Sequence, residues 1–183
     1  MADALAGRAP IHVPGRLEIA ALPPQARFSF RGDADALACA AAGFGLALPV
    51  GTCRALAVDD RAALWLGPDE WLLLAPKHAE DSVEDALRAA LGRVPHALVR
   101  ISDRHAALTV AGPHAGSLLA AGCALDLDAA AFPADMCTRT LLAKAEIVLW
   151  RHRPDGFRLE VPRSFAAYAW EFLAEAAREY AVA

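Results

Sequence analysis

The sequence predicts an α+β fold of two pseudo-repeated half-domains, each with the element order strand–helix–strand–strand–helix. Two alternating apolar segments that end in glycine, Phe28–Gly32 and Leu108–Gly112, lie about 80 residues apart. A second pair of similar strings, Leu72–Pro76 and Leu159–Pro162, follows later in each half. Because one half alone would leave a sheet face uncovered, we expect the two halves to pack as one body.

The expected domain organisation has three parts. Residues 1–26 contain four prolines and no sustained periodicity, which predicts an extended N-terminal arm. Residues 27–95 form the first α+β half, and residues 96–183 form the second. The length of 183 residues suits one domain or a fused pair of half-domains.

The first half begins with an alternating segment at 27–31, which predicts a strand. Asp33 can cap a helix that runs to about residue 42, where Gly43 supplies the stop. Two apolar runs flank Gly67-Pro68-Asp69-Glu70, a string of turn-forming residues that predicts a hairpin. The remaining elements expected in this half are strands at 54–58, 63–66 and 71–75 and a helix at 80–91.

The second half is expected to repeat this order. Pro113 opens its first helix, at a position where the missing N–H of proline costs nothing. Pro154-Asp155-Gly156 predicts a turn between two strands, and Ser164 can cap the last helix. The expected strands are 97–101, 107–110, 139–142, 146–151 and 157–161, and the helices end near residues 122 and 180.

Composition and charge exclude several classes of partner. With 56% apolar and 22% charged residues, the chain should fold rather than stay disordered. A net charge of −4 without basic clusters argues against nucleic acid or an anionic membrane surface. The least charged stretch, 36–53, is too rich in alanine, glycine and proline for a membrane span. The N-terminus lacks a secretory pattern, so we expect a cytoplasmic protein.

The cysteines do not form a recognisable metal or redox motif. They contain no C-x-x-C pair and no histidine at zinc-finger spacing. The equal gaps within each pair leave a disulfide or metal role open, but without a secretory context we expect reduced thiols. The four residues concerned are Cys39, Cys53, Cys123 and Cys137.

The sequence contains no complete catalytic set. Ser102-Asp103-Arg104-His105 brings a nucleophile, an acid and a base together, but neighbouring side chains point in different directions, so a polar turn is the better interpretation. The acidic pairs lie in expected turns where nothing would desolvate them. The glycine motifs of P-loops and dinucleotide-binding folds are absent. We therefore expect no catalytic, cofactor-binding or metal-binding residue in this chain.

The hairpin around Gly67-Pro68-Asp69-Glu70 is the strongest candidate for a contact with another protein. Aromatic side chains concentrate binding energy at interfaces, and an exposed polar turn lies between two tryptophans. For the two tryptophans themselves, packing in the core is the favoured interpretation, and an interface role is the alternative. The candidate interface residues are Trp65, Gly67, Pro68, Asp69, Glu70 and Trp71.

Three separated strings resemble a known family. They are Trp-Leu-Gly-Pro-Asp-Glu-Trp-Leu-Leu at 65–73, Ser-Asp-Arg-His-Ala-Ala-Leu-Thr-Val-Ala-Gly-Pro at 102–113, and Cys-Thr-Arg-Thr-Leu-Leu-Ala-Lys-Ala-Glu-Ile-Val-Leu-Trp-Arg at 137–151. Together with residues 157–170 they look like the gamma subunit of heterotetrameric sarcosine oxidase. The resemblance covers roughly residues 25–180, and that subunit is related in fold to the folate-binding aminomethyltransferases.

The resemblance implies a function within a complex. Such complexes demethylate sarcosine oxidatively to glycine, with hydrogen peroxide and either formaldehyde or methylenetetrahydrofolate as products. The resemblance also implies alpha, beta and delta partner subunits, which would hold FAD, FMN, NAD, folate and zinc, with no cofactor bound by this chain. A non-catalytic structural subunit is thus the expected function, and a stand-alone folate-binding or aminomethyltransferase-like protein is the alternative.

Overall fold

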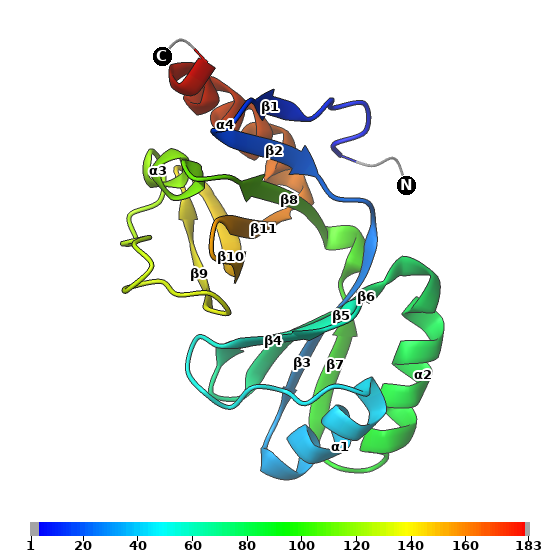
Figure 1. The fold of residues 1–183 in the computed structure, drawn as a ribbon. Coiled ribbons are helices and arrows are strands. Elements are labelled where there is room, and N and C mark those ends of the chain that lie inside the picture. The colour runs from blue at the N-terminus through cyan, green and yellow to red at the C-terminus, as the bar shows by residue number, and fades with distance from the viewer. Residues whose placement is uncertain (1–3, 182–183) are drawn as a thin grey trace. The chain divides into compact units, whose positions relative to one another are not determined.

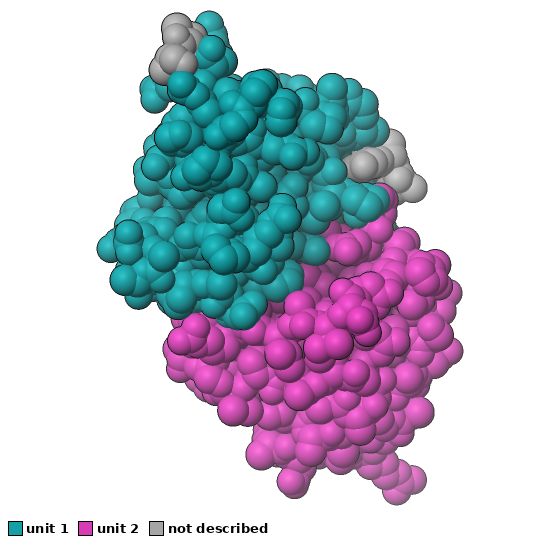
Figure 2. Space-filling view, viewed as in Figure 1, with its two compact units in different colours: residues 1–23, 103–183 teal, residues 24–102 magenta. Residues whose placement is uncertain are grey.

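A computed structural model describes residues 4–181 of the chain, and it divides into two compact units. Residues 24–102 form one unit, here called the central unit, and the segments before and after it form the terminal unit (Figure 2). Each unit has its own antiparallel sheet and its own helices (Figure 1). The predicted α+β class is confirmed.

The sheet of the central unit has five strands in the order β4-β5-β6-β3-β7, and every neighbouring pair is antiparallel. Without β4 this is the βαββαβ topology of ferredoxin-like folds. In chain order the elements are β3 (Gln25–Gly32), α1 (Ala34–Phe44), β4 (Ala55–Val58), β5 (Arg61–Gly67), β6 (Glu70–Pro76), α2 (Glu80–Leu91) and β7 (His96–Arg100).

The core of the central unit lies between the sheet and its two helices. Phe28 and Phe30 alternate with polar neighbours on β3 and are fully buried. Phe44 of α1 and Leu87 of α2 belong to the same apolar cluster. The helix α2 has the bounds that its apolar stripe predicts, and its buried residues follow helical spacing.

The sheet of the terminal unit has six strands in the order β1-β2-β8-β11-β10-β9. Its elements are β1 (Ile11–Val13), β2 (Leu17–Ala21), β8 (His105–Ala111), α3 (Ala115–Ala120), β9 (Cys137–Leu142), β10 (Ala145–Arg153), β11 (Gly156–Pro162) and α4 (Ala166–Ala181). The helices α3 and α4 pack with one face of this sheet in a second apolar cluster. Short 3₁₀ turns at 77–79, 102–104 and 163–165 precede α2, β8 and α4.

The N-terminal segment differs from the extended arm expected for residues 1–26. Strands β1 and β2 form a hairpin, and β2 pairs with β8 from Glu18↔Ala111 to Ala21↔Leu108. Leu17 and Ile19 are buried in the core of the terminal unit. The sequence signal was weak because the alternation lasts only a few residues between prolines, whereas pairing with a distant strand stabilises the hairpin. Residues 1–3 of the predicted arm lie outside the described residues.

The boundary between the two units also differs from the expected division at residue 95. Strand β7 was expected to open the second half, but it pairs with β3 from Phe28↔Arg100 to Gly32↔His96. The central unit therefore extends to residue 102. Strand pairing over this sequence distance is decided by tertiary contacts and leaves no local signal.

Helix α1 begins as predicted but ends later. The Asp33 carboxylate accepts a hydrogen bond from the Ala36 amide at 3.0 Å, which confirms the N-cap. The helix continues through Gly43, and Gly45, with φ of 70°, is its left-handed C-cap. A Cβ atom at Gly43 would meet the Ala86 carbonyl oxygen of α2 at 2.8 Å. Gly43 therefore allows two helices to pack closely and does not end one of them.

Three further sequence expectations can be compared with the described residues. None of the helices in this part of the chain is long and apolar enough to cross a membrane. All four cysteines have free thiols, and Cys123 and Cys137 are buried. Within residues 4–181, no group of three or more metal-binding side chains comes together.

Candidate functional site

The β5–β6 hairpin forms at the predicted turn and holds the six candidate interface residues. Trp65 and Trp71 are partners across the ladder, and an irregularity in register lies between Trp65 and Gly67. Gly67 and Glu70 are the last paired residues, so Pro68 and Asp69 form the tip. The turn chemistry of the sequence therefore placed the hairpin correctly.

The two tryptophans have different environments. Trp71 is 3% exposed, its ring centroid lies 5.7 Å from that of Phe30, and its Nε1 donates to the Pro49 carbonyl oxygen at 2.7 Å. Trp65 is half-buried at the border of the same apolar cluster. Trp71 is a core residue that ties the loop before β4 to the sheet, because a buried indole N–H needs a hydrogen-bond acceptor.

The tip of the hairpin is exposed and charged. Arg31 Nη2 donates to both oxygens of the Asp69 carboxylate, at 3.1 and 3.0 Å. This hydrogen bond, and then the charges of Asp69 and Glu70, raise the pKa of Arg31 further above its ordinary value. Both side chains of the pair are more than half exposed, so the pair contributes little stability. The amide of Gly32 also donates to the Asp69 carbonyl at 3.1 Å and helps to fix the tip.

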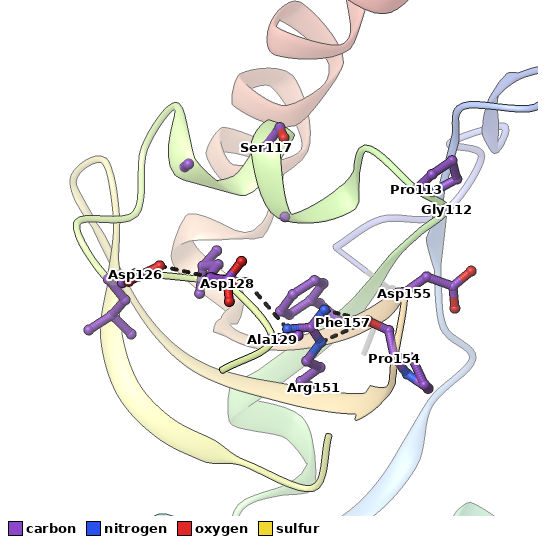
Figure 3. Close-up of a pocket in the computed structure, with 14 residues that line it drawn as sticks. Gly112, Pro113, Ser117, Asp126, Asp128, Ala129, Arg151, Pro154, Asp155 and Phe157 are labelled. Atoms are coloured by element: carbon purple, nitrogen blue, oxygen red, sulfur yellow. Dashed lines mark hydrogen bonds between the residues drawn. The ribbon is translucent and has the colours of Figure 1, made fainter. Parts of the chain in front are cut away.

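The terminal unit contains a pocket of about 490 Å³ between α3, the loop that follows it, and the turn between β10 and β11 (Figure 3). Its lining includes Gly112, Ser117, Asp126, Asp128 and Phe157, with Arg151 beneath them. The pocket gathers residues that the sequence analysis placed in a helix, in strands and in turns, and Arg151 was not singled out there.

The guanidinium of Arg151 binds backbone carbonyls. It donates from Nε to Pro154 at 2.8 Å and from Nη1 to Phe132 at 2.8 Å and Leu127 at 3.3 Å. The guanidinium carbon of Arg151, Cζ, lies 5.0 Å from the ring centroid of Phe157 (Figure 3). The Arg151 side chain is buried and its donors are paired with these carbonyls, so it holds the loops around the pocket in place. Sequence reasoning missed this role because the acceptors are backbone atoms, which carry no residue signal.

The carboxylates of the pocket are also engaged locally. Asp126 accepts from the amide of Asp128 at 2.9 Å, and Asp128 accepts from the amide of Ala130 at 2.8 Å. These are side-chain-stabilised turns, as expected for aspartates in loops. No histidine, cysteine, lysine or tyrosine lines the pocket, and the titratable side chains beside Ser117 in its lining are aspartates and Arg151.

The tetrapeptide at 102–105 forms a structural contact. Ser102 is buried, and its hydroxyl accepts a hydrogen bond from the Arg27 amide at 2.9 Å. Asp103 is exposed, and Ser102 and Asp103 belong to different compact units. The same hydroxyl hydrogen-bonds the Glu80 carboxylate, so Ser102 belongs to a structural hydrogen-bond network.

A cluster of charges connects α2 with β7. Arg100 donates to Glu84 at 2.6 Å and to Asp81 at 2.7 Å, and Lys77 pairs with Glu80 at 2.5 Å. Burial disfavours ionisation of Glu80, but hydrogen bonds and charges from Lys77, Ser102 and Arg100 outweigh it and lower its pKa. The hydrogen bond from Arg88 and the pairing with Arg100 likewise lower the pKa of Glu84. Carboxylates that are held ionised beside arginines favour a structural role for this cluster.

Comparison with solved structures first defines the class of protein. Over 89% of its length the chain superposes on 48% of the glycine cleavage aminomethyltransferase T from Bartonella henselae, with a TM-score of 0.66 and 14% identity. A chain of the heterotetrameric sarcosine oxidase from Corynebacterium sp. U-96 is similar over 99% of this chain and 93% of its own length. For that chain the TM-score is 0.89 and the identity 27%. The fold is thus of the aminomethyltransferase type.

Sequence comparison then defines the family. The model of the sarcosine oxidase gamma subunit family matches residues 31–179. The gamma subunit from Corynebacterium sp. strain P-1 is 36% identical over 77% of this chain and 68% of the relative. The gamma subunit from an Arthrobacter species is 34% identical over 82% of this chain and 73% of the relative. The chain belongs to the sarcosine oxidase gamma subunit family.

Proposed function

We propose that this chain is a structural, non-catalytic subunit of a heterotetrameric sarcosine oxidase. The observation that carries the proposal is the match of nearly the whole chain to a chain of such an enzyme, at a TM-score of 0.89. The gamma subunit relatives support the same assignment. The chain then contributes to an oxidative demethylation of sarcosine to glycine, with hydrogen peroxide and formaldehyde or methylenetetrahydrofolate as products.

The non-catalytic part of the proposal is supported by the way reactive side chains are used. The Ser102 hydroxyl is held by a backbone amide, and the Arg151 guanidinium is held by carbonyls. Two aspartates of the pocket, Asp126 and Asp128, accept hydrogen bonds from neighbouring amides. Each of these groups makes hydrogen bonds within the fold, whereas catalysis needs a nucleophile, base or acid that faces a substrate.

We further propose that the partners are alpha, beta and delta subunits, and that these hold FAD, FMN, NAD, folate and zinc. The absence of phosphate-binding glycine motifs from this sequence is consistent with nucleotide binding elsewhere in the complex. The hairpin turn Gly67–Glu70, with Pro68 and Asp69 exposed at its tip and half-buried Trp65 beside it, is proposed as one of the contacts with a partner. Trp71 does not belong to this contact surface because it is buried in the core.

We infer that the two units are repeats of one ancestral unit. In both, a strand, a helix, three strands and a second helix follow one another, as in β3-α1-β4-β5-β6-α2 and β8-α3-β9-β10-β11-α4. The sheet orders β4-β5-β6-β3 and β9-β10-β11-β8 correspond in the same way. Beside the first strand of each repeat lies one further strand, β7 next to β3 and β2 next to β8, and β1 then forms the edge of the terminal sheet.

The test of the structural role is co-expression of the complex with and without this chain. We expect that the remaining subunits, without it, fail to form a stable, active oxidase. A complex that assembled and turned over normally in its absence would refute the proposal. The alternative, a stand-alone folate-binding protein, predicts saturable binding of tetrahydrofolate to the isolated chain at micromolar concentrations, which we do not expect.

A further inference from the structure

We propose that the open edge of strand β4 binds an extended segment of a partner subunit, which adds a sixth strand to the sheet of the central unit. This inference rests on the proposed function, because it assumes that the chain works within a complex. The four sheet edges of the described chain are β1, β9, β4 and β7. An open edge exposes unpaired N–H and C=O groups, so folded proteins protect such edges by charge, shortness or a covering segment.

Three of these edges are protected and β4 is not. Strand β1 has only three residues, β9 carries Arg139, and Arg100 of β7 lies in the charge cluster with α2. Strand β4 reads Ala-Leu-Ala-Val and contains no charge, proline or glycine. Leu56 and Val58 are 37% and 52% exposed, and Val50 in the preceding loop is 76% exposed. This combination of an uncharged edge and exposed apolar side chains is typical of a strand that pairs with another chain.

The hydrogen-bond pattern identifies which backbone groups face outward. The Trp65 amide donates to the Arg54 carbonyl at 2.9 Å, so Arg54 and Trp65 are a hydrogen-bonded pair of the β4–β5 ladder. Because bonding alternates along an antiparallel ladder, Leu56 and Val58 bond inward and Ala57 directs its N–H and C=O to the open edge. Leu56 and Val58 share one face of the sheet, where they offer an apolar surface to alternate side chains of an added strand.

The charges at the two ends of β4 differ, because Arg54 precedes the strand and two aspartates follow it, and these aspartates define the chemistry of the added segment at that end. Asp59 and Asp60 form the turn after β4, both are exposed, and neither makes an ion pair with any residue in 4–181. A lysine or arginine of the incoming segment fits beside them, next to apolar residues that face Leu56 and Val58. The opposite end of β4 continues to Trp65 and the hairpin tip, so this edge extends the contact surface proposed above.

The experiment uses proline to block the edge. Ala57→Pro removes the outward N–H and places the ring where a partner strand would lie, while the ladder with β5 keeps its inward bonds. Leu141→Pro on the edge strand β9 is the matched control. Like Ala57 in its own hairpin, Leu141 lies one position before the closing pair of the β9–β10 hairpin, so its N–H also faces the open edge. The readout is recovery of the tagged chain with its partner subunits after co-expression, with the thermal unfolding temperature of each purified variant measured alongside.

We expect Ala57→Pro to lower recovery of the complex by at least about tenfold, and Leu141→Pro to leave it near wild type. If Ala57→Pro lowers the unfolding temperature markedly, Val58→Lys tests the same edge with an unchanged backbone and is expected to weaken assembly similarly. Asp60→Lys should also weaken assembly, most strongly at low salt.

Two results would overturn the proposal. The first is normal assembly of both Ala57→Pro and Val58→Lys. The second is a homodimer of the isolated wild-type chain that Ala57→Pro dissociates while assembly with the partners is unchanged, which would make the occupant a second copy. A wild-type chain that does not assemble with the other subunits at all would instead refute the proposed function, so the two failures are distinguishable.

Discussion

At the scale of single residues, the stability of this chain depends on side chains that satisfy buried backbone groups. The Trp71 indole and the Arg151 guanidinium each donate to carbonyls of a neighbouring loop. Neither loop contains regular secondary structure that could satisfy those carbonyls. A side chain that supplies the missing donor therefore fixes the loop, and its removal leaves a buried acceptor unpaired.

Trp71→Ala is expected to lower the free energy of unfolding by about 3–5 kcal/mol, because a large buried ring is removed from the core. Trp71→Phe keeps most of the ring but loses the donor to Pro49, and should cost about 1–2 kcal/mol. Urea unfolding measures both. Trp65→Ala, at the half-buried partner position, is the control and should cost less. Unchanged stability with weakened assembly would instead make Trp71 an interface residue.

Arg151→Met is expected to cost about 2–4 kcal/mol, because the carbonyls of buried Leu127 and Phe132, and that of Pro154, lose their donor. Arg153→Met, two residues along the chain and exposed, should change stability by no more than about 0.5 kcal/mol. Thermal unfolding of the two variants compares them directly. Equal effects would show that charge, and not the carbonyl contacts, governs this region.

At the scale of elements, local chemistry in the sequence was sufficient wherever the signal was local. Asp33, the Gly67–Glu70 turn and the apolar stripe of α2 predicted a cap, a hairpin and a helix, all of which the structure confirms. Gly43 was misinterpreted because a glycine that stops a helix and a glycine that allows close helix packing look the same in sequence. The distinction depends on Ala86 of α2, which lies far along the chain.

Two glycines in helices therefore give opposite predictions. Gly43→Ala should destabilise by about 1–3 kcal/mol despite the better helix propensity of alanine, because the new Cβ would meet the Ala86 carbonyl at 2.8 Å. Gly116→Ala in α3 should stabilise by up to about 1 kcal/mol, because its nearest neighbour would be Leu127 at an ordinary 3.7 Å. Chemical denaturation measures both changes, and stabilisation by Gly43→Ala would contradict the close packing of α1 and α2.

The charge cluster of α2 predicts sensitivity to acid. The folded-state pKa values of Glu80 and Glu84 lie below the ordinary 4.5, so the unfolded chain binds protons more readily than the folded one. Their stabilisation is complete above pH 4.5 and is lost as pH falls through the lowered pKa values. Urea unfolding measured from about pH 6 to about pH 3.5, a range that brackets this window, should show the loss of stability. A double variant, Glu80→Gln with Glu84→Gln, should be less stable at pH 6 and less sensitive to acid, and an unchanged pH dependence would contradict it.

At the scale of the whole molecule, the sequence predicted two α+β units but not their exact composition. The central unit is continuous, whereas the terminal unit combines residues before and after it, because β2 pairs with β8. Such pairing brings together Ala21 and Leu108, which no local pattern connects. The pocket could not be predicted from the sequence either, because Arg151 stabilises its loops through hydrogen bonds to backbone carbonyls.

The hairpin tip tests whether the chain functions through its surface. Asp69→Lys reverses the charge at the exposed tip and removes the pair with Arg31, so stability should change by no more than about 1 kcal/mol. If the tip contacts a partner subunit, as we propose, recovery of the complex should fall by at least about tenfold, since like charges or a lost contact at a docked site weaken binding. The matched control is Glu175→Lys on α4, which is also exposed and paired with an arginine. Equal recovery of the complex for the tip variant and wild type would show that the tip is only a structural turn. The contact with the partners would then lie on other surfaces, such as the edge of β4.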